Sequence, residues 1–113
     1  MSASAAHQRK NPRFIVNVPA RLRVEDQALP ARLCNVCRDA ALVEANKGFP
    51  LETEVAVAME LPGTGGPLEV SGRVIRLAPG EQGTHGMAIL FTDVPTAAAD
   101  RIDFFVAVQE TQA

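Results

Sequence analysis

The sequence has no tryptophan and no tyrosine, and five phenylalanines make up its whole aromatic content of 4%. Proteins that bind single-stranded nucleic acid stack successive bases on several aromatic rings. So few rings make such a platform hard to assemble. We therefore predict no nucleic-acid partner.

Long apolar runs are also absent. A transmembrane helix needs about 18 apolar residues in a row, whereas the longest runs here are residues 87–91 and 104–108. Residues 1–11 are small and polar and lack the apolar segment of a secretory signal. Two cysteines in a chain that can build a core do not make a disulfide framework. These features predict a cytoplasmic protein with no membrane insertion.

Catalytic and metal-binding side chains are scarce. His7 and His85 are the two histidines, and His7 lies in a small, polar stretch where nothing holds it. Cys34 and Cys37 offer one ligand pair, but a structural zinc site uses a second paired element, which the sequence lacks. The sequence predicts no metal site and no catalytic residues, so we expect that the protein is not an enzyme.

One enzymatic alternative stays open, because Cys34 and Cys37 have the Cys-x-x-Cys spacing of a redox pair. A strand before the pair and a helix after it would lower a thiol pKa, as in a thiol-disulfide oxidoreductase. The strand-like patterns on both sides provide no parallel strand-helix-strand unit for such a site. Ordinary small buried cysteines are the favoured interpretation.

The chain does contain enough apolar material for one domain, with 113 residues of which 47% are hydrophobic. Its charge is divided unevenly. Residues 1–38 carry seven basic and two acidic residues, a net charge of +5, whereas residues 39–113 carry four basic and eleven acidic ones, a net charge of −7. A basic N-terminal part favours an anionic partner.

Alternating apolar and polar residues predict mostly strands. Residues 14–24 follow this period of two, and Pro19 within them indicates an edge or a bulge. The further strand candidates are residues 29–36, 40–45, 54–61, 68–78 and 84–91, and a helix opens at 95–99. Residues 40–45 also suit a helix that stops at Gly48. The apolar phase shifts within 68–78, as a bulge would produce.

This order predicts a mainly β fold, a small six-stranded antiparallel β-barrel with a C-terminal α-helix. The apolar face of that helix is placed on Ala98, Ile102, Phe105 and Val106, which recur at helical spacing. Residues 1–12 are predicted to form a flexible basic N-terminal arm, and residues 13–113 to form the barrel domain.

Two short segments flank the first two predicted strands. RKNPR, at residues 9–13, precedes the first strand, and NVCRDA, at residues 35–40, follows the second. With the later hairpin, the ending GMAILFTDVP and the terminal helix, this order resembles the PilZ domain. Members of that family bind the bacterial second messenger cyclic di-GMP through an RxxxR segment and a downstream [D/N]xSxxG segment.

The resemblance implies a PilZ-like barrel with cyclic di-GMP as its ligand. Arg9 and Arg13 match both arginines of the first segment and carry over as clamps on phosphates and guanines. Asn35 matches the second segment, but Cys37 stands where Ser is expected and Ala40 where Gly is expected. A thiol is a weak donor, and a Cβ blocks close approach or a positive φ. Each departure is predicted to cost about 1 kcal/mol or more, which together weakens binding on the order of a hundredfold.

The function implied is a cyclic di-GMP receptor or adaptor in bacterial signalling, with a degenerate second motif and an unidentified effector protein as partner. Ligand binding would order the arm against the barrel. The alternative is a PilZ-like protein-interaction module that binds no nucleotide. The thiol-disulfide oxidoreductase is a distant third interpretation.

Overall fold

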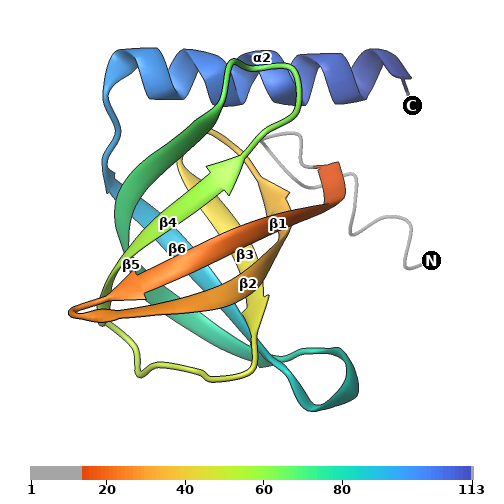
Figure 1. Ribbon diagram of the computed structural model, residues 1–113. Coiled ribbons are helices and arrows are strands. Elements are labelled where there is room, and N and C mark those ends of the chain that lie inside the picture. Colours follow the sequence, from red (N-terminus) through yellow and green to blue (C-terminus); the bar gives the residue numbers. More distant parts are fainter. Residues whose placement is uncertain (1–13, 113) are drawn as a thin grey trace.

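The protein is a closed barrel of six antiparallel strands with a helix across one end (Figure 1). The computed structural model describes residues 14–112. Its elements are β1 (Phe14–Val24), β2 (Gln27–Val36), β3 (Ala40–Ala45), β4 (Glu54–Glu60), β5 (Pro67–Pro79), the short helix η1 (Glu81–Gly83), β6 (His85–Asp93) and α2 (Thr96–Gln112). The order around the barrel is β1-β2-β3-β6-β5-β4. The predicted six-stranded barrel with a C-terminal helix is confirmed.

Strand β3 shows how alternation closes the barrel. Ala41, Val43 and Ala45 are buried in the interior, whereas Leu42 and Glu44 lie on the outside and are half-buried. β3 pairs with β2 on one edge and with β6 on the other, so its backbone polar groups find partners along both edges. The alternative of a helix over residues 40–45 is wrong. Six residues make a poor isolated helix, and the two neighbouring strands decide their conformation.

Two predicted strand boundaries shift by two residues, and the others by one at most. β2 begins at Gln27, so the turn after β1 contains only Glu25 and Asp26, and Glu25 takes the positive φ of 55° that a tight turn uses. β6 extends two residues beyond its predicted end at Phe91, because Asp93 still pairs with Ser71 of β5. Both differences lengthen a strand by residues that end in a polar side chain. A pattern of hydrophobic residues does not detect such strand ends.

Pro19 lies beside the irregularity that its presence predicted. The register between β1 and β2 shifts between Ile15 and Val18, and the β1–β4 ladder begins only at Ala20. Pro19 is therefore outside the β1–β4 ladder, so its missing N–H removes no hydrogen bond between these two strands.

The bulge predicted in β5 is confirmed, since the register against β6 shifts between Ser71 and Gly72 and again between Val74 and Arg76. At Gly72 the backbone of β5 lies close to that of β6. A Cβ built on it would lie 2.5 Å from the carbonyl oxygen of Leu90, so a larger residue would force β5 and β6 apart.

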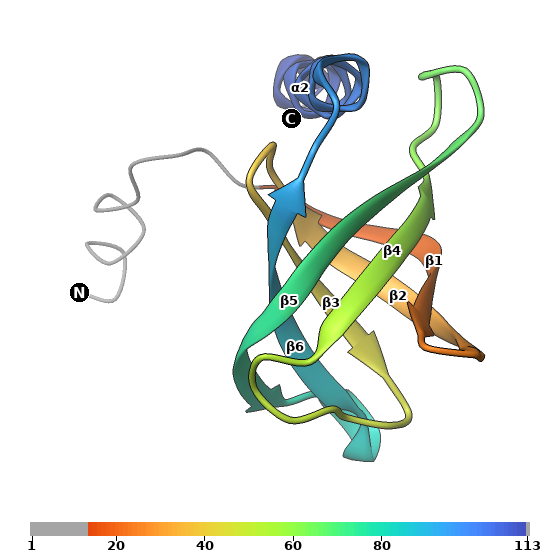
Figure 2. The ribbon, with the colours of Figure 1, turned by 90° about the vertical axis from the view of Figure 1, so that its left-hand side faces the viewer.

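Helix α2 lies across the end of the barrel (Figure 2). Ile102 and Phe105 are buried, and Ala98 and Val106 pack partly buried against the same core, as predicted; Ala99 is buried as well. Burying a side chain such as Ile102 or Phe105 stabilises the fold by about 1.5–3 kcal/mol. Within residues 14–112 no helix is long and apolar enough to cross a membrane.

Candidate ligand-binding site

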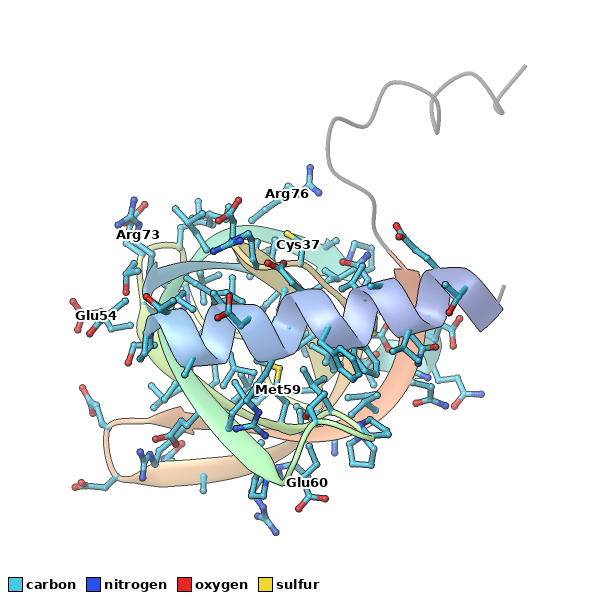
Figure 3. All side chains as sticks on the ribbon, turned by 90° about the horizontal axis from the view of Figure 1, so that it is seen from above. Cys37, Glu54, Met59, Glu60, Arg73 and Arg76 are labelled. Carbon is cyan, nitrogen blue, oxygen red and sulfur yellow. The ribbon has the colours of Figure 1, made fainter. Side chains whose placement is uncertain are left out.

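A hollow of about 280 Å³ lies on the outer wall of the barrel and brings three predicted site residues together. Asn35 at the end of β2, Cys37 after it and Ala40 at the start of β3 all line it. The other lining residues are Ala41, Leu42, Ile75, Arg76 and Ala88. We call this the outer hollow. Figure 3 shows Cys37 and Arg76 on the same side of the barrel, seen along its axis from the helix end.

The backbone holds the motif residues in a tight hairpin turn. The N–H of Cys37 donates to the carbonyl oxygen of Ala40 at 2.9 Å, and Arg38 and Asp39 form the tip. The N–H of Phe91 donates to the carbonyl oxygen of Asp39, also at 2.9 Å, which anchors the turn to β6. A register shift between Leu33 and Asn35 precedes this turn. These bonds fix the backbone of the motif before any ligand arrives.

Ala40 does not have a positive φ. This chain therefore does not hold a Cβ in a conformation that favours glycine, and the predicted need of the ligand for a positive φ at this position stays a prediction. The start of β3 has ordinary strand geometry, which any residue adopts. What Ala40 adds to the outer hollow is only the bulk of a methyl group.

The turn is also tied to the terminal helix. Nη1 of Arg38 lies 2.7 Å from Oδ2 of Asp103 on α2. Both side chains are exposed, so this ion pair contributes less than about 1 kcal/mol to stability. Arg101 of α2 donates to the carbonyl oxygen of Gly66 in the loop between β4 and β5. The helix is thus connected to two loops at its end of the barrel.

Arg76 is a lining residue that sequence reasoning missed. Four arginines already face carboxylates in ion pairs: Arg23, Arg32, Arg38 and Arg73. Arg76 is exposed and forms no ion pair with any residue of 14–112, so its guanidinium is available to an anion. The signal that could have found it is the phase shift in β5, because the bulge at Val74 and Ile75 changes which face Arg76 occupies.

The favoured interpretation predicted buried cysteines and is wrong, because Cys34 and Cys37 are both half-buried and free. Burial raises the pKa of the Cys34 thiol, and the negative charge of Glu44 raises this pKa further, although Arg32 opposes the shift. A raised pKa lowers the fraction of reactive thiolate. The segment after Cys37 is a strand and not the helix that a redox pair would use. The geometry does not support the oxidoreductase interpretation.

Other candidate residues lie elsewhere. Arg9, Arg13 and His7 are outside the described residues, so their predicted roles stay predictions. His85 is exposed on β6, at the start of the strand and away from α2. Within the described part of the chain, no three His, Cys, Asp or Glu side chains gather where they could hold a metal ion.

The structure is thus a helix-capped antiparallel barrel with a small, mostly apolar hollow on its wall. Comparison with protein families names it: the PilZ domain family matches residues 7–107. The chain belongs to the PilZ domain family, whose members are binding modules and not enzymes. A comparison with curated proteins gave no match.

Solved structures share this fold at low sequence identity. The PilZ domain of YcgR from Escherichia coli, solved with c-di-GMP, is 12% identical with a TM-score of 0.71 and covers 93% of each chain. The inhibitor of motility MotI/DgrA of Bacillus subtilis is 10% identical with a TM-score of 0.78 over 93% of this chain. This chain spans about half of it, 52%. The PilZ domain of CeSA from a cellulose-synthesizing bacterium is 15% identical with a TM-score of 0.63, covering 88% of this chain and 99% of that one.

Proposed function

We propose that the protein is a cytoplasmic cyclic di-GMP receptor or adaptor that acts by binding and not by catalysis. Family membership and the fold shared with a c-di-GMP-bound PilZ domain support this proposal. The observation that carries it is the outer hollow, where Asn35, Cys37 and Ala40 meet in one place beside Arg76.

The ligand's chemistry fits this wall. Cyclic di-GMP presents two phosphates and two guanine edges, and an arginine guanidinium can fork onto either group or stack on a purine face. The amide of Asn35 both donates and accepts hydrogen bonds, so it can pair with a guanine edge. Arg76 adds a positive charge from β5. In the proposal Arg9 and Arg13 supply the remaining guanidinium groups.

The size of the outer hollow limits how the ligand sits. Pockets for drug-sized ligands are about 300–1,000 Å³, and the outer hollow of about 280 Å³ lies just below that range. It suits one guanine or one phosphate group, and the rest of the ligand would lie against arginine side chains. We propose that residues 1–12 form an arm that orders against the barrel, residues 13–113, when the ligand binds. The ordered arm would present a new surface to an effector protein.

A second candidate function is a protein-interaction module that binds no nucleotide. The specific observation in its favour is the pair of departures at the outer hollow, a thiol at position 37 and a methyl group at position 40. A hydroxyl would donate a stronger hydrogen bond than the thiol of Cys37.

Calorimetric titration of the full chain with cyclic di-GMP separates the two candidates. We expect saturable binding that is lost in Arg9→Ala and in Arg13→Ala. Arg21→Ala is the matched control, because Arg21 is exposed on β1 and does not line the outer hollow. Equal losses in all three variants would indicate general charge attraction. No binding by the unmodified chain would favour the nucleotide-free module.

A further inference from the structure

Strand β5 extends beyond the end of its neighbour β4. Its ladder with β4 ends where Glu54 pairs with Arg73, and the loop before β4 adds two bonds at Val74. The N–H of Glu52 donates to the carbonyl oxygen of Val74 at 2.7 Å. The N–H of Val74 donates to the carbonyl oxygen of Thr53 at 3.0 Å. Beyond this point, residues 75–79 pair only with β6 among residues 14–112. We call residues 75–79 the open β5 edge.

The open β5 edge presents unused backbone groups. The N–H of Gly80 donates to the carbonyl oxygen of Thr84, so the peptide groups of Gly80 face the β6 side of the hairpin. Hydrogen-bonded and non-bonded positions alternate along an antiparallel pair. The N–H and carbonyl of Leu77 and the carbonyl of Pro79 therefore face away from β6. A row of such groups is a template for another strand.

Exposed aliphatic side chains gather at the same place. Four large hydrophobic residues of the described chain are exposed: Leu51 at 54%, Ile75 at 42%, Leu77 at 48% and Phe104 at 56%. Ile75 and Leu77 are on the open β5 edge, and Leu51 precedes the residue that bonds Val74. Phe104 is on α2, across the barrel from the β5–β6 hairpin, which projects at the opposite end (Figure 1).

A second hollow, of about 690 Å³, lies next to the open β5 edge. The loop between β3 and β4 and the β5–β6 hairpin form its walls, with Phe49, Leu77 and Pro79 among the lining residues. Lys47 and His85 are the titratable side chains that line it, and no carboxylate does. Nζ of Lys47 lies 5.5 Å from the centre of the Phe49 ring, and Lys47 forms no ion pair with a described residue.

We propose that the open β5 edge binds an extended, apolar and acidic segment of a partner protein by strand addition. The partner's backbone would pair with the groups at Leu77 and Pro79, and an alternate apolar side chain would enter the second hollow. A carboxylate on the segment would meet Lys47. A second copy of this chain is a poorer occupant, because its own second hollow would bring the same lysine, and its lining holds no carboxylate to meet Lys47. Leu77 and Pro79, whose backbone groups the partner would use, do not line the outer hollow.

The test uses the full chain labelled with ¹⁵N and capped heptapeptides of alternating valine and glutamate. We expect the peptide to shift the amide resonances of Leu77, Leu51 and Lys47, and to slow hydrogen exchange at the Leu77 amide at least fivefold. The same peptide methylated on alternate backbone nitrogens cannot complete the ladder and should bind at least tenfold more weakly. A peptide with lysine in place of glutamate should also lose most of its affinity.

Leu77→Glu should weaken binding of the valine-glutamate peptide at least tenfold. Phe104→Glu is the matched control, because it changes an equally exposed apolar residue on α2 and should leave binding unchanged. Equal binding of the methylated and unmethylated peptides, or resonance shifts confined to other surfaces, would overturn the proposal. So would a concentration-dependent dimer in light scattering that Leu77→Glu abolishes, since the occupant would then be a second copy.

Discussion

The two faces of β3 obey different constraints. Ala41, Val43 and Ala45 point inward and are buried, and any side chain there has to fit the packed interior. Ala40 and Leu42 point outward into the outer hollow. Relatives share the fold with TM-scores of 0.71 and 0.78 at only 12% and 10% identity. The inner face is therefore restricted to apolar side chains that fit the core, whereas the outer face carries the residues of the outer hollow.

The largest effect on stability is expected from substitutions inside the barrel. Ile89 of β6 is fully buried and pairs with Ala41 on one side and Val74 on the other. Ile89→Ala should lower the free energy of unfolding by about 2–5 kcal/mol, and Ile89→Val by about 0.5–1.5 kcal/mol, because each removes packed methyl groups and leaves a cavity. Denaturant titration measures both. A loss below 0.5 kcal/mol for the alanine variant, on the order of a surface substitution, would contradict the assignment of Ile89 to the core.

Restoring the degenerate motif on the outer face should strengthen ligand binding. The double change Cys37→Ser and Ala40→Gly restores a hydroxyl donor and removes a methyl group from the outer hollow. Affinity for cyclic di-GMP should rise by roughly one to two orders of magnitude, while the glycine lowers stability by about 0.5–1 kcal/mol. Calorimetry gives the affinity and thermal unfolding the stability. Affinity no better than that of the unmodified chain would place the defect elsewhere on the wall.

Arg76 tests the outer hollow from the β5 side. Arg76→Ala should weaken cyclic di-GMP binding by about tenfold, which corresponds to one charge-assisted hydrogen bond at an exposed site. Stability should stay within about 0.5 kcal/mol, since the side chain is exposed and unpaired among described residues. Arg73→Ala is a suitable control in the same strand, because Arg73 pairs with Glu52 and does not line the outer hollow. Equal losses in both variants would argue against a specific contact.

The smallest effect is expected between the turn and α2. Arg38→Ala and Asp103→Ala should each lower stability by less than about 1 kcal/mol, because their ion pair is exposed. A double-mutant cycle isolates the interaction, and 1 M salt should reduce it, since exposed charges are screened. A coupling energy that high salt leaves unchanged would contradict an electrostatic link.

Much of the fold was predictable because most strands are half-buried and show the period of two. Residues 40–45 were ambiguous, since six Ala-rich residues fit either state until β2 and β6 pair with them. The motif residues of the outer hollow could be found from their spacing. The phase shift in β5 indicated that Arg76 changes face, but its place beside the motif residues could not be predicted, because only the barrel order places β5 beside β6 and β6 beside β3. The backbone conformation of Ala40 was likewise invisible in the sequence.

The most direct test of the central claim, that the outer hollow is the ligand site, is to map cyclic di-GMP binding by ¹⁵N nuclear magnetic resonance on the full chain. We expect the largest amide shifts at Asn35, Cys37, Ala40 and Arg76, and little change at the amide of Leu77. Shifts centred on Leu77 and Ala78, or spread evenly over the basic surface with none at Asn35 and Cys37, would contradict the claim.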